Sequence, residues 1–374
     1  MLNKVLGILF FLSGGLACAQ HVTAANWNFA VSGDSRNCGD VVMPAIAKSV
    51  VKNQAEFYWH LGDFRAMNAV DEDMAKRYGE KLTLPEYQQM AWGDFIANQI
   101  APFGDIPVHL GIGNHELVAR SVADYLSQFG YWLNAPEVHA QHGNAYAHDG
   151  SLNTYYHWKQ HNVDFINLDN AGDDGFDDDQ LQWFERILAR DKSDPGVATV
   201  VVAMHRALPN SLACGHSMND DEKTRSTKGT QSGRRAYGDM VQWKHETNRR
   251  VYVLASHSHY FMQDLYDTPY WNNPAHGEVL PGWIVGSAGA RRNRLPDLSA
   301  EMLAKTKAET DVWGYLRGNV SKNGEITFDF IKVSAKDLPK KFHDLYGDDL
   351  IVGFCSNGNK DDSQHPPPAS CNDK

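Results

Sequence analysis

Short runs of β-branched and aromatic residues recur along the chain, and glycine or polar residues bound each run, a pattern typical of buried strands. The predicted strands are 27–33, 57–62, 106–112, 163–169, 197–204, 250–255 and 283–287. Two hairpins are also expected, one joining 155–158 to the strand that starts at Val163, and a closing one with strands 313–320 and 326–332. Longer segments separate the strands, so we expect a layered α/β fold.

Helical periodicity predicts helices at 43–56, 85–100 and 179–190. In the last one, Leu181, Phe184 and Leu188 share one stripe, and acidic residues stand at its start, where the helix dipole favours them. Segment 212–237 is polar and has no clear period, so we predict a long loop there. Residues 365–369 have the proline-rich composition of a tail.

The composition and charge narrow the class of protein. The chain has 374 residues, of which 42% are hydrophobic and 22% charged, so it can bury a large core and is neither disordered nor collagen-like. We expect one elaborated domain over residues 20–335, followed by a C-terminal extension over 336–374. The net charge of −11 argues against a general nucleic-acid or anionic-membrane surface. A phosphate-bearing partner must therefore be held by a local site.

The N-terminus has the pattern of a secretory signal peptide over residues 1–19. Lys4 precedes an apolar run at 5–12, and Ala17-Cys18-Ala19 fits the small-x-small pattern before a cleavage site, so we expect the mature chain to begin at Gln20. This run is too short to cross a bilayer, and no other segment is long and apolar enough. We therefore expect a secreted or periplasmic protein without a transmembrane segment. The alternative is a lipid anchor through Cys18.

Four further cysteines are compatible with disulfides in an exported protein. They are Cys38, Cys214, Cys355 and Cys371, and an even number allows three pairings. The favoured pairing is Cys355 with Cys371, within the tail, and Cys38 with Cys214, between two loops expected on one face. Free buried thiols are the alternative.

Residues that can bind a metal or a phosphate directly follow five of the predicted strands. They are Asp34 with Arg36, Asp63, Asn114 with His115 and Glu116, His205, and His257 with His259. Ligands of open α/β sheets bind beyond the carboxyl ends of the strands, so these side chains can converge on one site. Taken singly, each has a simpler interpretation, as a turn residue for the aspartates and Asn114 or as a hydrogen-bonded or solvated histidine.

The combination favours a metal centre. Two carboxylates, an amide and three imidazoles form a mixed oxygen and nitrogen donor set that suits one or two ions of Zn, Mn or Fe. A carboxylate can bridge two ions about 3.5–4 Å apart, an arrangement that activates water for phosphoryl displacement.

The ordered series Gly62-Asp63, Gly113-Asn114-His115-Glu116, His205 and His257-Ser258-His259 resembles that of the calcineurin-like metallophosphoesterase superfamily. The resemblance covers residues 27–290 and implies a four-layer α/β/β/α sandwich with mixed sheets and a two-metal centre. By position, Asp63 would bridge both ions. Asp34 and His259 would serve the first site, and Asn114, His205 and His257 would complete the second. His115, oriented by Glu116, would protonate the leaving oxygen or stabilise charge on the phosphoryl group.

The sequence departs from the family pattern at two positions. Arg36 stands where the family has a histidine ligand, and a guanidinium stays protonated and cannot ligate a metal. Ala66 stands where the purple acid phosphatases have a tyrosine, so we do not expect a tyrosinate-bound ferric centre. Arg36 either clamps a phosphate oxygen or places its charge at the first metal position. Arg65 repeats the Asp-x-Arg spacing, and a structural ion pair explains it at least as well.

The sequence therefore predicts an exported metal-dependent phosphoesterase that hydrolyses a phosphomonoester or phosphodiester through a metal-activated water. The alternative is a non-catalytic or one-metal phosphate or nucleotide binder of the same fold, motivated by Arg36. Three residues of the predicted long loop, His216, Asn219 and Arg225, either line the substrate entrance or face solvent. Neither the substrate nor the oligomeric state follows from the sequence.

Overall fold

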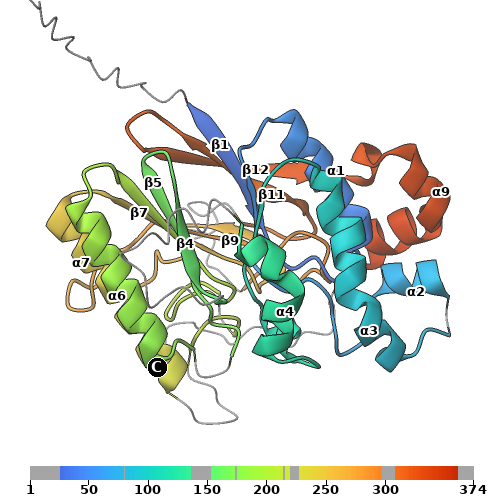
Figure 1. The fold of residues 1–374 in the computed structure, drawn as a ribbon, viewed down its shortest axis with the longest axis horizontal. Coiled ribbons are helices and arrows are strands. Elements are labelled where there is room, and N and C mark those ends of the chain that lie inside the picture. The colour runs from blue at the N-terminus through green and yellow to red at the C-terminus, as the bar shows by residue number, and fades with distance from the viewer. Residues whose placement is uncertain are drawn as a thin grey trace, which may run out of the picture.

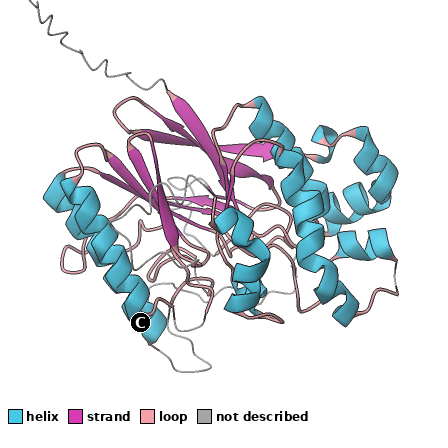
Figure 2. Cartoon of the chain, viewed as in Figure 1, coloured by secondary structure: helices cyan, strands magenta, loops and turns pink. Residues whose placement is uncertain are grey.

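The computed structural model describes residues 26–79, 81–135, 153–172, 175–213, 215–219, 227–296 and 308–360. Two mixed sheets lie face to face at its centre, and helices cover their outer faces (Figures 1 and 2). This is the layered arrangement that the resemblance implies, so the predicted fold class is confirmed. The predicted signal peptide and the proline-rich tail lie outside the described residues.

The five-stranded sheet has the order β12-β11-β1-β2-β3. Its strands are β12 (Ile326–Val333), β11 (Trp313–Val320), β1 (Trp27–Ser32), β2 (Tyr58–His60) and β3 (Val108–Leu110). The strands β1, β2 and β3 are parallel, whereas the hairpin β11–β12 joins the sheet antiparallel to β1. The carboxyl ends of the three parallel strands therefore meet at one edge.

The seven-stranded sheet has the order β10-β8-β9-β7-β6-β5-β4. Its strands are β10 (Ala308–Glu309), β8 (Phe261–Gln263), β9 (Gly282–Val285), β7 (Arg250–Ala255), β6 (Thr199–Ala203), β5 (Val163–Asn167) and β4 (Tyr156–Gln160). A parallel set, β5-β6-β7-β9, forms its middle. Every predicted strand is present, but most end one or two residues before their predicted end because the chain turns into polar loops there.

The helices form the outer layers. They are α1 (Gly39–Lys52), α2 (Glu72–Tyr78), α3 (Leu84–Phe95), α4 (Val122–Leu133), α6 (Asp178–Ser193), α7 (Lys228–Thr247) and α9 (Lys340–Asp348). Figure 1 shows α6 and α7 on one side of the sheets and α1, α3 and α9 on the other. Two π-helical segments, Ile96–Ile100 and Asp349–Gly358, extend α3 and α9, and short 3₁₀ turns lie at Ala101–Phe103, Asn114–Leu117 and Ala335–Asp337.

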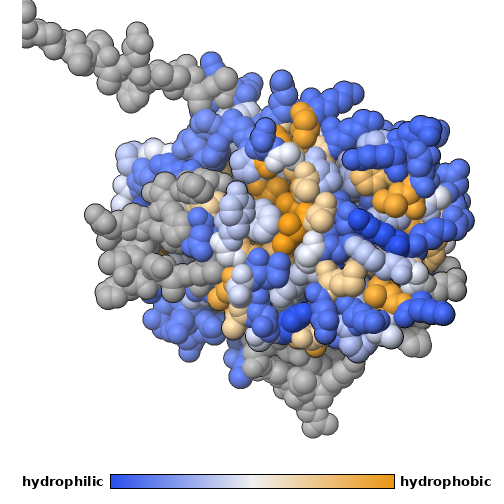
Figure 3. Space-filling model, turned by 45° about the vertical axis from the view of Figure 1, so that its right-hand side comes forward, coloured by the Kyte–Doolittle hydropathy of each residue, from blue (hydrophilic) through white to orange (hydrophobic). Residues whose placement is uncertain are grey.

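Aromatic rings fill the space between the two sheets. The ring of Phe165 on β5 contacts those of Phe29 and Phe57, which belong to the opposite sheet and its approach, with centroids 5.0 Å apart in both pairs. On the face drawn in Figure 3, the described residues are mostly hydrophilic at the periphery, and hydrophobic residues lie in smaller groups between them. No helix of the described ranges is both long and apolar enough to span a bilayer.

The predicted loop at 212–237 is wrong in its second half, because α7 begins at Lys228. Small residues on its buried face, Gly233 and Ala236 among them, hid the helical period. A Cβ atom at Gly233 would lie 2.4 Å from Cδ of Pro209, so close packing explains the glycine. A buried helix face made of small residues and Tyr237 does not give the apolar periodicity by which a helix is predicted from sequence.

The predicted disulfide pairing is also wrong. Cys38 is bonded to Cys355, with their Cα atoms 5.9 Å apart. The C-terminal segment folds back over the start of α1, so the partner of Cys38 comes from far along the chain and not from a neighbouring loop. Cys214 and Cys371 lie outside the described residues.

Candidate metal centre

The polar residues that follow the strands do gather at one place. Asp34 and Arg36 follow β1, Asp63 follows β2, and Asn114, His115 and Glu116 form the 3₁₀ turn after β3. His205 follows β6, and His257 and His259 follow β7. The edges of the two sheets at which parallel strands end therefore supply all the predicted ligands.

Left-handed backbone at three of these positions aims the side chains inward. Asp34, Asp63 and His257 have φ angles of 61°, 60° and 65°, in a region that residues other than glycine rarely occupy. Hydrogen bonds hold this backbone, since the amide of Asp34 donates to the carbonyl of Gly62 at 3.0 Å. Gly62 has φ 92°, and a Cβ atom there would lie 2.4 Å from the amide nitrogen of Gly113. Glycine is required where these two loops cross.

One group of donors surrounds Nε2 of His205. This atom lies 3.0 Å from Oδ1 of Asn114, 3.0 Å from Nδ1 of His257 and 3.3 Å from Oδ1 of Asp63. On the other side of the ring, Nδ1 donates to the carbonyl of Leu61 at 2.9 Å, which directs Nε2 into the group. Together with Nε2 itself, these are four nitrogen and oxygen atoms that could each bind the same cation, the number of ligands found in many metal sites.

The electrostatics agree with a site for a positive charge. Burial lowers the pKa of His205, but the carboxylates of Asp63 and Asp34 outweigh it and raise that pKa to about 9. Burial raises the pKa of Asp63, but His205, His115 and Arg36 hold it well below its usual value. Both shifts have the same cause, a surplus of acceptors that favours a positive charge at this place, and a metal cation would supply such a charge.

A second group shares Asp63 with the first. Ligand atoms of Asp34, Asp63 and His259 lie within 4.8 Å of one another, and Nε2 of His259 is 3.3 Å from Oδ1 of Asp34. Within the described ranges, Oδ1 of Asp34 and Oδ2 of Asp63 are buried without a hydrogen-bond donor. Such buried acceptors are costly unless a cation or ligand meets them, so the residues fit at least one bound metal ion.

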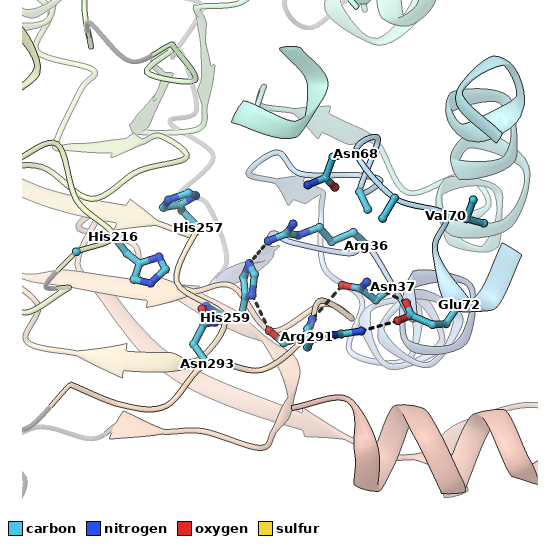
Figure 4. Close-up of a pocket in the computed structure, with 13 residues that line it drawn as sticks. Arg36, Asn37, Asn68, Val70, Glu72, His216, His257, His259, Arg291 and Asn293 are labelled. Atoms are coloured by element: carbon cyan, nitrogen blue, oxygen red, sulfur yellow. Dashed lines mark hydrogen bonds and ion pairs between the residues drawn. The ribbon is translucent and has the colours of Figure 1, made fainter. Parts of the chain in front are cut away.

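Arg36 reaches into this second group. Its Nη2 lies 2.9 Å from Nε2 of His259, its Nη1 lies 2.5 Å from Nε2 of His115, and its Nε is 3.9 Å from Oδ2 of Asp63 (Figure 4 shows the contact with His259). Arg65 points elsewhere. Its guanidinium is fully buried and pairs with carboxylates, so the structural interpretation of Arg65 is correct.

His115 and Glu116 make mostly backbone contacts. The amide of His115 donates to Oδ1 of Asp63 at 2.9 Å, and its ring Nδ1 contacts the carbonyl of Ala66. Glu116 accepts hydrogen bonds from the amides of Gly113, Asp63 and Phe64, each at 2.8 Å. These contacts join the loops after β2 and β3, so the carboxylate of Glu116 fixes the backbone around Asp63.

A cavity of about 410 Å³ opens above the metal-ligand groups. His257, His259 and Arg36 form its floor, and its walls include Asn37, Asn68, Glu72, His216, Arg291 and Asn293 (Figure 4). Of the three predicted entrance residues, His216 lines it, Asn219 instead accepts from the amide of Asn210, and Arg225 lies outside the described residues.

Sequence reasoning missed Arg291 and Asn293 as cavity residues. The carbonyl of Arg291 accepts from Nδ1 of His259 at 2.6 Å, and Oδ1 of Asn293 accepts from the amide of His259 at 2.9 Å. Both follow strand β9, as the other site residues follow their strands. The polar residues that follow the predicted strand 283–287 could therefore have identified Arg291 and Asn293 as site residues.

Comparison with known proteins gives one family match. The model of the calcineurin-like phosphoesterase family matches residues 30–261. No curated protein matches the chain. Among solved structures, a purple acid phosphatase, PPD1, from seeds of yellow lupin (Lupinus luteus) is 14% identical with a TM-score of 0.53. The match covers 84% of this chain and 52% of the lupin chain, so the chain spans about half the length of that enzyme. PhoD is 16% identical with a TM-score of 0.49, over 82% of this chain and 69% of PhoD.

Proposed function

The chain belongs to the calcineurin-like phosphoesterase family, a family of hydrolases that act on phosphoric esters, and from this premise we propose that it is an exported metal-dependent phosphoesterase. The observation that carries the proposal is the convergence of Asn114, His257 and Asp63 on Nε2 of His205. These four residues would hold the ion, and nitrogen and oxygen donors of this kind suit Zn, Mn or Fe. A bound ion of this class supplies Lewis acidity and lowers the pKa of a coordinated water towards ~7.

The chain's own residues would bind and orient the phosphoryl group. Arg36 lines the floor of the cavity, and each Nη atom has a second N–H beside the one donated to His115 or His259, so the guanidinium could still donate to phosphoryl oxygens. Nε2 of His115 faces Arg36 and not solvent, and burial lowers the pKa of this ring. We assign to His115 the stabilisation of charge on the phosphoryl group, through its hold on Arg36. Protonation of the leaving oxygen is the second role open to it.

The cavity favours a small ester. Its volume of about 410 Å³ lies at the lower end of the range for small-molecule sites, which is about 300–1,000 Å³. Asn68, Asn293 and Arg291 offer hydrogen-bond donors around the floor. These features accommodate a phosphomonoester, or a diester with one compact substituent.

Export rests on the signal-like residues 1–19 and gains support from the disulfide. A buried Cys38–Cys355 bond is typical of proteins that fold in an oxidising compartment. We propose residues 20–335 as the catalytic domain and 336–374 as an extension that packs on it. Helix α9 contacts α2, and the 3₁₀ turn Ala335–Asp337 contacts α1.

Hydrolysis of a chromogenic phosphomonoester and of a chromogenic phosphodiester tests the proposal. The purified chain is assayed with Mn²⁺ or Zn²⁺, with and without chelator, beside His205→Ala. Hydrolysis that chelator abolishes and that His205→Ala lacks would support the enzyme. Phosphate binding by calorimetry without hydrolysis of either ester would instead support the non-catalytic binder that Arg36 suggests.

A further inference from the structure

We infer that this centre binds a single metal ion, at His205 and its neighbours, and that the guanidinium of Arg36 takes the place of a second ion. The inference rests on the proposed function for its setting, but it concerns the number of ions that the site can hold. The observation behind it is the position of Arg36 between His115, His259 and Asp63.

Arg36 uses the atom through which His259 would bind an ion. Nδ1 of His259 donates to the carbonyl of Arg291, so the neutral ring offers one lone pair, at Nε2. That lone pair accepts from Nη2 of Arg36 at 2.9 Å. A metal ion would need the same lone pair at about 2.0–2.1 Å. Both cannot be bonded to it together.

The charge count also favours one ion. The buried carboxylates of Asp34 and Asp63 carry two negative charges, and Arg36 returns one positive charge at a distance of 3.9 Å from Asp63. One divalent ion already outweighs the remaining negative charge. A second would leave the buried centre strongly positive, next to a guanidinium that cannot release its proton.

The His205 group is left intact by this arrangement. The contacts that the described structure gives to the Arg36 side chain are with His115, His259 and Asp63. Oδ1 of Asp63, the oxygen that faces His205, is not the one nearest to Arg36. A full set of donors therefore remains for one ion, with a fixed organic cation beside it.

This arrangement gives Arg36 a defined task. It holds a permanent positive charge and a planar pair of donors at the floor of the cavity, where a second ion would otherwise neutralise a phosphoryl oxygen. His115 and His259 each accept one N–H bond and so fix the plane of the guanidinium.

Metal content tests the inference without reference to activity. The metal-free chain is titrated with Mn²⁺ and with Zn²⁺ by calorimetry, and the ions retained after desalting are measured by plasma mass spectrometry. We expect one equivalent in the natural chain and two in Arg36→His, where an imidazole replaces the guanidinium. The Mn²⁺-loaded Arg36→His should also give the spin-coupled resonance signal of an ion pair, which the natural chain lacks.

Two variants serve as controls. Arg291→His changes another arginine of the cavity wall, paired with Glu72 at 2.8 Å, and should still bind one equivalent. His205→Ala should retain none. If Arg36→His fails to fold by circular dichroism, Arg36→Ala replaces it, and a second, weaker equivalent is expected.

Two equivalents in the natural chain would overturn the inference, and so would a single equivalent in both the natural chain and the folded Arg36 variant. A chain that binds one ion and two after the substitution, yet hydrolyses no ester, would uphold the inference and defeat the proposed function. The two ideas can therefore fail separately.

Discussion

Replacing Arg65 by methionine tests whether a buried charge cluster holds the first three helices together. Arg65 is fully buried, and its guanidinium pairs with Asp40 of α1, Asp73 of α2 and Asp94 of α3. Oδ2 of Asp40 also accepts from the hydroxyl of Tyr346 in α9 at 3.0 Å. Methionine keeps an unbranched apolar stem but removes the guanidinium, with its charge and its donors.

The expected loss is large because the partners stay buried. Removing one member of a buried ion pair costs about 3–5 kcal/mol, since the other member is left without compensation. Here four carboxylates lose their common partner, because Asp71 also lies 3.6 Å from Nη1 of Arg65, so we expect a loss at the upper end of that range at pH 7.5. At pH 5.5 the loss should be smaller, because burial already raises the pKa of Asp73, and protonation removes the unpaired charge.

Urea unfolding followed by tryptophan fluorescence measures the change at both pH values. The matched control is Arg317→Met, which breaks an exposed pair with Asp329 at 3.1 Å and should cost less than about 1 kcal/mol. A double variant with Asp40→Asn should recover part of the loss. A loss for Arg65→Met no greater than that of the control would refute the reasoning.

Three further outcomes are expected. His115→Ala should lower turnover by about 10²–10³-fold, the usual cost of losing one group that stabilises charge in the transition state, while metal content, read by mass spectrometry, stays unchanged; full turnover would contradict its assigned role. Replacing Cys38 and Cys355 together by serine should lower the free energy of unfolding by about 2–5 kcal/mol, measured by urea titration against the oxidised chain. Burial raises the pKa of Asp40 to about 6, so its share of stability is fully present below pH ~4 and declines as pH rises through about 6, by up to about 3 kcal/mol. The pH dependence of unfolding should be shallower in Asp40→Asn, and an equally steep one would exclude Asp40 as its source.

The strands of both sheets could be predicted from the local sequence pattern, because runs of β-branched residues such as Val200–Val202 are typical of strands buried on both faces. The same pattern did not predict α7, because the buried face of this helix includes the small residues Gly233 and Ala236 and so lacks a clear apolar stripe. It also failed for the disulfide, since the approach of Cys355 to Cys38 depends on how the C-terminal segment packs against α1.

That the candidate ligands gather at one place was predictable because they follow strand ends, and parallel strands bring those ends together. His205, His257 and Asp63 meet for that reason. That Arg36 reaches the site was predicted, but its partners there were not. Its direction depends on the left-handed turn at Asp34 and on the acceptors His115 and His259, which come from other strands.

The covalent link between Cys38 and Cys355 has a consequence for the order of assembly. Cys38 follows Arg36 by two residues, and its partner lies 317 positions further along the chain. The turn that carries the arginine thus gains its permanent tether only after almost the whole polypeptide has been synthesised and oxidised. Completion of this pocket is therefore a late event, and a nascent chain that ends before residue 355 would carry Asp34 and Arg36 on a turn that lacks this covalent tether.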